Sequence, residues 1–307
     1  NIKNYAHGMF QSVYDYPYLS SSANHIFDLT VGYASGSALN SASSVQNTKK
    51  INIYNQMAQV LVGYNETGEI REFDRDGNFA TAGGGGDKLR ECLFINFSRL
   101  LTKDEIKKGS FIFTALTGGT PASPTDALTI QDHGAASTYL TNSPAGEYAV
   151  LYTGSAAVAG TGVGLLYYQA GIAVLTASVF DGTFGAPAAT YDTSSIEAVL
   201  TGSEISSSCD GIRNRWQDCD YNNTTELNST IYFCRASSNE FNYSSNPTYL
   251  SGSKIRVKNV STDSPSAYIT TIGLYSEDNE LLAVAKVSEP LKKDPTNELT
   301  LRVRLDY

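Results

Sequence analysis

The segment LTLRVRLD at residues Leu299–Asp306 carries the clearest structural pattern in the chain. Its Leu and Val side chains alternate with Thr, Arg and Asp, the period of two that is typical of a β-strand with one buried and one solvated face. Two more candidate strands, residues 268–275 and 280–287, flank the polar sequence SEDN at residues 276–279. That order predicts a β-hairpin followed by a strand at the carboxyl end of the chain.

The rest of the chain shows few helical patterns. Apolar side chains at residues 53–62 recur at the i, i+3, i+4 and i+7 spacing of one helical face, and Gly63 stands where helices often end. A second short helix is expected at residues 209–217. Further candidate strands lie at residues 90–97, 147–152, 163–169 and 172–180. We therefore expect a mainly β (α+β) fold, with antiparallel sheets in a sandwich-like core and a few short helices.

Composition divides the chain into four parts. Residues 1–22 are rich in Tyr, Ser and turn-forming sequence, and predict an N-terminal arm that packs against another surface. Residues 117–201 contain no Lys or Arg and are dominated by Ala, Gly, Thr and Ser, which predicts an inserted β-rich lobe. Residues 23–116 would then form the first part of the core, and residues 202–307 the second part, with the carboxyl-terminal hairpin and strand.

Length and charge exclude several classes of protein. A chain of 307 residues can bury a continuous core without a disulfide, a metal or a cofactor. Its net charge of −9 argues against direct binding of nucleic acid, which requires Lys and Arg to neutralise phosphates. The apolar stretches are shorter than the roughly 18 residues of a membrane span. We also expect no signal peptide, and a trimmed or processed N-terminus because the sequence does not begin with Met.

One segment partly matches a calcium-binding loop. Asp74, Asp76 and Asn78 copy the first three ligand positions of such a loop, where oxygen atoms converge on the cation. The loop also needs Gly at its sixth position and Glu at its twelfth, which are here Phe79 and Gly85. We therefore expect a turn built on the Asp-Gly pair of this segment rather than a metal site.

The remaining reactive side chains show no catalytic spacing. His7, His25 and His133 are scattered, without a zinc motif or a close acidic partner in the sequence. The glycines at residues 83–86 precede Asp87, whose charge would repel phosphate, so we expect a linker rather than a phosphate loop. The four Cys residues form no C-x-x-C pair, and free thiols would fit assembly in the cytoplasm. These observations predict no catalytic, cofactor-binding or metal-binding residues, and hence no enzyme.

Two blocks of sequence are similar to a known family. The first consists of SANHIFDLT at residues 22–30 and KKINIYNQMAQVL at residues 49–61. The second begins with NEFNYSSNPTY at residues 239–249 and continues through YITTIGLY at 268–275 and LLAVAK at 281–286 to the carboxyl end. Together these blocks resemble virion structural proteins of tailed bacteriophages, in particular of large contractile-tailed phages of marine and cyanobacterial hosts.

This resemblance implies a non-enzymatic structural subunit of the virion and carries no catalytic residue over to this chain. We expect many copies, which assemble in the bacterial host cytoplasm with one another and with other virion structural proteins. The tail or baseplate is the favoured position, with head decoration or a neck ring as alternatives. A receptor-binding module and a tail-associated hydrolase with dispersed carboxylates stay open as functions of other classes.

The tyrosines supply the candidate contact residues. The chain contains 20 Tyr, a residue type that is enriched where surfaces become buried against other chains. Three of them lie close together in the N-terminal arm, where an exposed apolar patch would be costly. We therefore expect Tyr14, Tyr16 and Tyr18 to contact a neighbouring subunit.

Overall fold

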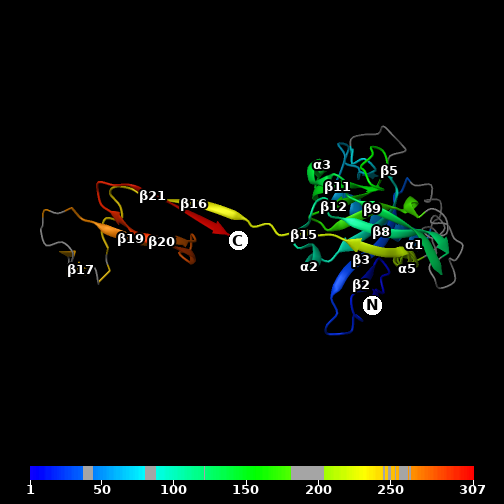
Figure 1. The fold of residues 1–307 in the computed structure, drawn as a ribbon, viewed down its shortest axis with the longest axis horizontal. Helices are drawn as coiled ribbons and strands as arrows, with labels where there is room; N and C mark the ends of the chain where they lie inside the picture. Colours follow the sequence, from blue (N-terminus) through cyan, green and yellow to red (C-terminus); the bar gives the residue numbers. More distant parts are fainter. Residues whose placement is uncertain are drawn as a thin grey trace. The chain divides into compact units, whose positions relative to one another are not determined.

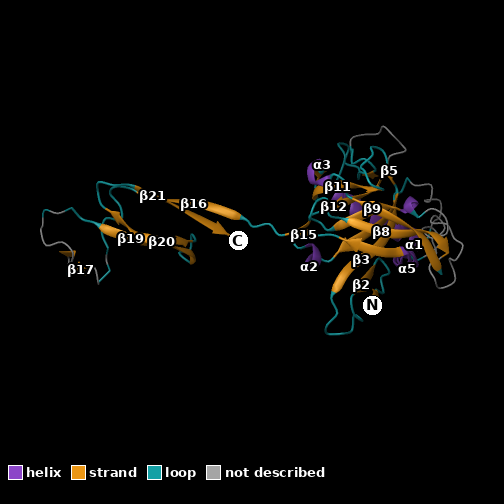
Figure 2. Ribbon diagram, in the orientation of Figure 1, coloured by secondary structure: helices purple, strands orange, loops and turns teal. Residues whose placement is uncertain are grey.

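The computed structural model describes residues 1–36, 44–79, 88–120, 122–180, 204–244, 246–247, 250–252, 254–255, 262 and 264–307. The chain falls into two compact units, Asn1–Thr225 (unit 1) and Glu226–Tyr307 (unit 2). Strands make up most of the regular structure in both units (Figure 2). The expectation of a mainly β fold with antiparallel sheets is therefore confirmed.

Unit 1 is built on an 11-stranded sheet in which all neighbouring strands are antiparallel (Figure 1). The strands lie in the order β1-β2-β3-β6-β13-β12-β11-β9-β8-β14, and β10 pairs with β11. Their bounds are β1 (Ile2–Asn4), β2 (Gln11–Tyr14), β3 (His25–Tyr33), β6 (Glu91–Phe97), β8 (Ile112–Thr120), β9 (Ser123–Gln131), β10 (Leu140–Ser143), β11 (Gly146–Thr153), β12 (Gly162–Tyr167), β13 (Ile172–Thr176) and β14 (Trp216–Asp220).

The core of unit 1 lies around the middle of this sheet. The sequences of β6, β12 and β13 are nearly continuous apolar runs, and side chains on both faces of these strands are buried. Helices α1 (Val45–Leu61) and α5 (Ile205–Arg215) both contact β3. Two short strand pairs lie outside the sheet, β4 (Phe73–Asp74) with β5 (Lys88–Leu89) and β7 (Glu105–Ile106) with β15 (Asn223–Thr224).

Helix α1 extends further toward the N-terminus than the predicted segment at residues 53–62. Its first turn is capped by the Ser44 side chain, which accepts a hydrogen bond from the backbone N–H of Asn47. At the other end the Gly63 N–H donates to the Ala58 carbonyl (2.9 Å), with a φ of 82° that Gly adopts without strain. The first turns carry Asn, Thr and Lys rather than an apolar stripe, which is why the periodicity missed them.

The second predicted helix, at residues 209–217, is also confirmed in part. Helix α5 ends at Arg215, because Trp216 and Gln217 already belong to β14, which pairs with β8. The other helical segments among the described residues are short. They are α2 (Arg99–Thr102), α3 (Ala135–Thr138) and the 3₁₀ turn η2 (Ala177–Val179).

The prediction of an inserted lobe over residues 117–201 is wrong for the described part of that range. Strands β9, β11, β12 and β13 all belong to the central sheet, and β13 pairs directly with β6 from Ile172 opposite Asn96 to Thr176 opposite Cys92. Strands β11, β12 and β13 of this segment are largely buried, and Lys and Arg are rare at buried positions. Residues 181–203, like the glycines at residues 83–86, lie outside the described residues.

The other predicted boundaries differ as well. Residues 1–22 do not form a separate arm, because β1 and β2 extend the central sheet beyond β3 and bury Gln11 and Ser12. The break between the units falls after Thr225, whereas a boundary near residue 202 was expected. Among the described residues, the main core cluster therefore comes from residues 1–225, and the carboxyl-terminal strands form a unit of their own.

Within the described residues, unit 2 consists of three two-stranded ribbons. They are β16 (Ser229–Ala236) with β21 (Leu299–Asp306), β19 (Ala267–Tyr275) with β20 (Leu281–Lys293), and β17 (Leu250–Ser251) with β18 (Lys254–Ile255). The turn between β19 and β20 closes through a hydrogen bond from the Ser276 N–H to the Glu280 carbonyl (2.9 Å), and Asn279 adopts a φ of 62° there. The predicted hairpin and carboxyl-terminal strand are confirmed.

Candidate functional site

The predicted contact tyrosines lie on β2 and in the loop that follows it. Tyr14 is half-buried, and its ring centroid lies 6.2 Å from that of Tyr18 and 5.5 Å from that of His25. Tyr16 and Tyr18 are 59% and 43% exposed. The structure therefore brings Tyr14 and Tyr18 together and leaves two of the three rings open to a partner.

A serine, an aspartate and a histidine meet beside these rings. Asp28 Oδ1 accepts a hydrogen bond from Ser12 Oγ (2.5 Å) and lies 2.8 Å from His25 Nε2. The expectation that His25 has no close acidic partner is therefore wrong, since Asp28 follows it by three residues. A catalytic triad needs the serine on the imidazole and the carboxylate on the other ring nitrogen. Here hydroxyl and imidazole contact the same carboxylate oxygen, an arrangement that does not activate a nucleophile.

A cavity of about 500 Å³ lies next to this cluster, between β3, β6, helix α1 and the loop before β2. Its polar wall comes from Asp28, which lies directly opposite Asn96 in the sheet, and from Gln56 of α1. The rest of the lining is mostly apolar, and the lining residues are His7, Met9, Phe10, Asp28, Thr30, Ile53, Gln56, Met57, Phe94 and Asn96. Such a cavity could hold a small apolar molecule with one hydrogen-bonding end.

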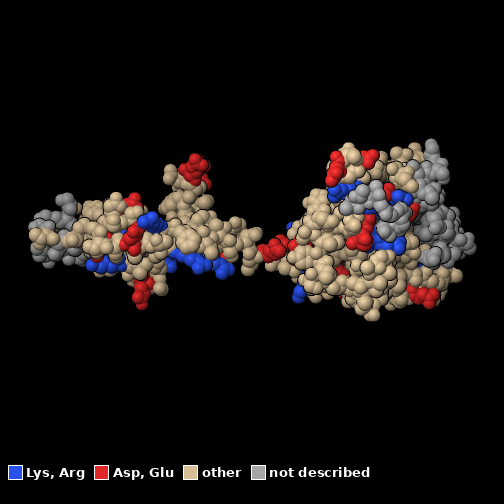
Figure 3. All heavy atoms as spheres, turned by 90° about the horizontal axis from the view of Figure 1, so that it is seen from above, with Lys and Arg blue, Asp and Glu red and all other residues tan. Residues whose placement is uncertain are grey.

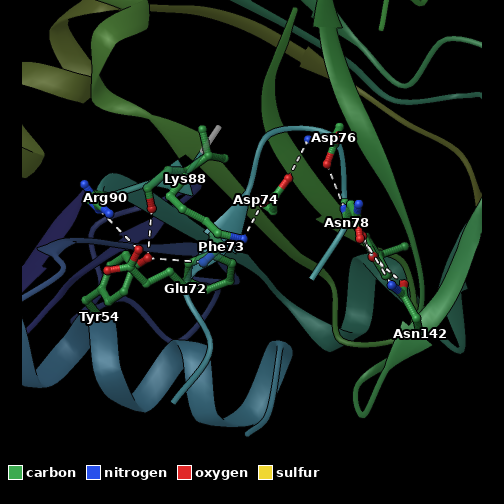
Figure 4. A network of polar contacts seen from close by, with 12 residues as sticks. Tyr54, Glu72, Phe73, Asp74, Asp76, Asn78, Lys88, Arg90 and Asn142 are labelled. Carbon is green, nitrogen blue, oxygen red and sulfur yellow. Dashed lines mark hydrogen bonds and ion pairs between the residues drawn. The ribbon is translucent and has the colours of Figure 1, made fainter. Parts of the chain in front are cut away.

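The segment that resembles a calcium loop forms a turn anchored by polar contacts (Figure 4). Asp74 Oδ2 lies 2.5 Å from Lys88 Nζ, and its Oδ1 accepts a hydrogen bond from the Asp76 N–H (3.1 Å). Asp76 in turn accepts from the Asn78 N–H (2.8 Å). The Gly77 carbonyl accepts from the Tyr148 hydroxyl (2.9 Å). The predicted turn is confirmed, and its carboxylates are already engaged by donors of the chain itself.

Two buried carboxyl groups in unit 1 have raised pKa values. Burial raises the pKa of Asp74 and that of Asp132. Asp132 accepts hydrogen bonds from the Tyr168 hydroxyl (2.8 Å) and from the backbone N–H groups of Gly109 (2.7 Å) and Phe111 (3.0 Å). Neither carboxyl group lines the cavity beside Asp28. Both carboxyl groups position the backbone and the side chains that donate to them.

Among the described residues, no group of three or more His, Cys, Asp or Glu is arranged to hold a metal ion.

The two units differ sharply in how many of their apolar side chains are buried. Of the buried apolar side chains among the described residues, 40 lie in unit 1 and three in unit 2. Conversely, 12 of the 23 large apolar side chains that are exposed belong to unit 2, the smaller unit. These 12 are Leu227, Ile231, Tyr232, Phe233, Phe241, Tyr243, Tyr268, Tyr275, Leu281, Leu282, Val284 and Tyr307.

The ribbon of β19 and β20 carries apolar side chains on both faces. On one face Ile272 and Leu274 lie opposite Ala285 and Ala283, and all four are half-buried. The other face carries Val284, which lies opposite Gly273 and is 55% exposed. Tyr275 and Leu282 extend this exposed face, and the Tyr275 ring occupies the space that a side chain at residue 273 would need.

The ribbon of β16 and β21 has one apolar face and one face that mixes apolar with charged and polar side chains. Tyr232 lies opposite Val303 and Cys234 opposite Leu301, so that one face is apolar along its length. On the other face Phe233, which is 69% exposed, lies opposite Arg302. The alternation of β21 is confirmed, because Val303 is buried and its leucines are half-buried while the intervening polar residues are exposed.

The exposed apolar side chains of β16, β19 and β20, called here the ribbon surface, are the candidate interaction site of this protein. Acidic and basic side chains are scattered over unit 2, with broad areas that carry neither (Figure 3). The ribbon surface was not predicted from the sequence. The unbroken apolar run LLAVA at residues 281–285 could have indicated it, because such runs are typical of strands that are covered on both faces.

Comparisons with protein-family models, curated proteins and solved structures give no match to this chain. No helix among the described residues combines the length and the hydropathy that crossing a lipid bilayer requires.

Proposed function

We propose that this chain is a non-enzymatic structural subunit of a tailed-phage virion, present in many copies and placed in the tail or baseplate. The observation that carries the proposal is the ribbon surface, where apolar side chains such as Val284 and Phe233 are exposed. Monomeric soluble proteins rarely expose contiguous apolar surface of more than a few hundred Å². An assembled particle supplies the neighbouring subunits that would cover it.

The sequence blocks at residues 22–30, 49–61 and 239–249 support a virion role, because they resemble structural proteins of contractile-tailed phages. They favour no particular layer of the particle, so head decoration and a neck ring are the alternative positions. The proposed partners are copies of the same chain and other virion structural proteins. The net charge of −9 supports the view that it does not contact nucleic acid directly.

The buried carboxyl groups support a non-enzymatic role. A hydrolase built from dispersed carboxylates would gather acids with perturbed pKa values at one cavity. Asp74 and Asp132, the described acids with raised pKa values, are instead held by backbone and side-chain donors, Asp74 in β4 and Asp132 just after β9. The Asp28 carboxylate faces the cavity, but it is engaged by Ser12 and His25.

Purified particles provide the test. An antibody against the chain should label intact virions at the tail or baseplate in electron micrographs, and quantitative mass spectrometry should find several copies per particle. Labelling of the head surface or the neck would instead support head decoration or a neck ring. Particles that lack the chain would contradict the structural role in every form.

A further inference from the structure

Strand β20 has an apolar sequence but an exposed environment. The run LLAVA at residues 281–285 is apolar at every position, a pattern typical of strands that are covered on both faces. In unit 2 that run belongs to a two-stranded ribbon, and Leu282 and Val284 are 67% and 55% exposed. An isolated two-stranded ribbon is only marginally stable in water. Its sequence therefore suits a strand with a further layer on each side.

We propose that ribbons of further copies of this chain supply those layers, so that β16–β21 and β19–β20 of several chains form one shared β core. This inference rests on the proposed function, which brings many copies together. It adds that unit 2 is the part through which the copies bind one another, and that unit 2 completes its folding only when they do.

The charge distribution favours a second copy as the occupant of the ribbon surface. Residues 226–307 carry nine Lys and Arg against ten Asp and Glu, a net charge of −1, whereas residues 1–225 carry 13 against 21, a net charge of −8. Copies of unit 2 can therefore approach one another without the long-range repulsion that copies of unit 1 would feel. The net charge of −1 on unit 2 would attract neither a strongly basic nor a strongly acidic partner.

Six of the charged side chains of unit 2 stand in three pairs of opposite sign. Arg235 contacts Glu298, Arg304 lies 2.7 Å from Asp306, and Lys292 lies 3.2 Å from Asp294. A surface that offers both signs side by side can meet an identical surface with opposite charges facing each other. Such self-complementarity is what a closed homo-oligomer requires.

The exposed area is a substantial part of what a specific interface needs. Eight of the 12 exposed apolar side chains of unit 2 lie on β16, β19 and β20, and four of these eight are aromatic. At roughly 100 Å² of exposed surface for each half-exposed ring, the four rings amount to about 400 Å², half of the 800 Å² or so that each partner buries in a standard interface, before the four aliphatic side chains are added. Each of the four main strands is also paired on one side only among the described residues, which leaves backbone N–H and C=O groups for a neighbouring strand.

A charged substitution at Val284 tests the inference, with Val158 as a matched control. The two valines are 55% and 53% exposed, and Val158 lies in unit 1, between β11 and β12. In a monomer both Val284→Asp and Val158→Asp would be tolerated. We expect the wild-type chain and Val158→Asp to form the same oligomer at micromolar concentration, and Val284→Asp and Phe233→Asp to need at least tenfold more protein. Equal assembly of all four proteins, or a monomeric wild type, would overturn the inference.

Hydrogen exchange of the wild-type chain at two concentrations gives a second readout that involves no variant. Amides of β16, β19, β20 and β21 should be protected in the oligomer and exchange faster after dilution, while those of β3, β6 and β13 keep their protection. Equal protection of the ribbons in the diluted monomer would overturn the coupling of folding to association.

Measuring whether virions contain the chain distinguishes a failure of this inference from a failure of the proposed function. If virions contain the chain but the purified protein is a monomer with protected ribbons, the shared core is wrong and the structural role stands. If the chain self-associates through Val284 but is absent from virions, the shared core stands and the structural role is wrong.

Discussion

Gly32 of β3 packs so closely against helix α1 that a Cβ atom at Gly32 would lie 2.7 Å from the Lys50 carbonyl oxygen. The same Cβ would also lie 2.9 Å from the Tyr54 backbone nitrogen, so the obstacle is helix backbone rather than a side chain that can rotate away. The absence of a side chain at this position is what allows α1 to contact the sheet.

Gly32→Ala should therefore destabilise unit 1 by about 1–3 kcal/mol, because the helix must shift to admit the methyl group. Gly36→Ala is the control, since a Cβ there would meet its nearest atom at 3.7 Å, an ordinary contact distance. Urea unfolding followed by tryptophan fluorescence of Trp216 measures both variants. Equal stability of the two would mean that α1 is not held by this contact.

Lys50 itself should give unit 1 a stability that depends on pH. Its side chain is fully buried, and desolvation lowers its pKa from 10.5 to about 8. Below about pH 8 both the folded and the unfolded chain hold the proton, and the full cost of burying the charge applies. Between about pH 8 and 10.5 the unfolded chain binds the proton more tightly, so stability rises with pH across that window.

Lys50→Met removes this cost and should raise the free energy of unfolding by up to about 3 kcal/mol at pH 7. The advantage over the wild type should shrink as the pH approaches 10.5. Urea unfolding of the two proteins at pH 7 and pH 10 provides the comparison, and other titrating groups cancel because both proteins carry them. A constant difference between the two pH values would contradict the buried-charge explanation.

Asp132 should be more important for stability than its partner Tyr168. Asp132→Ala leaves the Tyr168 hydroxyl and the N–H groups of Gly109 and Phe111 without their acceptor, at about 1–3 kcal/mol for each buried donor. Tyr168→Phe removes one donor and should cost about 1 kcal/mol. Thermal unfolding should therefore rank the wild type above Tyr168→Phe and both above Asp132→Ala. The reverse order would show that Tyr168 makes the more important contact.

The exposed tyrosines of the N-terminal region should act in assembly rather than in folding. Tyr16 and Tyr18 are half-exposed, so replacing both with Ser should change the stability of unit 1 by less than about 0.5 kcal/mol. If a neighbouring subunit covers them, the double variant should enter particles less well than the wild type when the two compete. Tyr64→Ser is the matched control, because Tyr64 is 54% exposed elsewhere in unit 1. Equal incorporation would exclude these rings as contacts.

Deletion of residues 1–22 is a different experiment. It removes β1 and β2, along with the buried side chains of Gln11 and Ser12, and exposes the edge of β3. We therefore expect the deletion to lower the stability of unit 1, in contrast to the two point substitutions. A deletion variant that unfolds at the same urea concentration as the wild type would mean that the edge strands contribute nothing to stability.

Local patterns in the sequence determined the individual elements of this protein. The alternation at residues 299–306, the apolar run at 90–97 and the helical spacing at 53–62 each reflect the burial of neighbouring residues, so they are visible without the rest of the chain. The Asp-Gly turn at Gly77 was predictable for the same reason, because its φ of 76° is a local conformation that Gly adopts without strain.

Only the tertiary structure decided which strands lie side by side. Strand β13 pairs with β6 across a long stretch of intervening sequence, and composition alone assigned the two strands to different domains. The meeting of Ser12, His25 and Asp28 likewise depends on β2 pairing with β3. The ribbon surface is the clearest case. The apolar run at residues 281–285 indicates burial on both faces, but its exposure within one chain, on which the proposed association rests, appears only when the strands are placed in space.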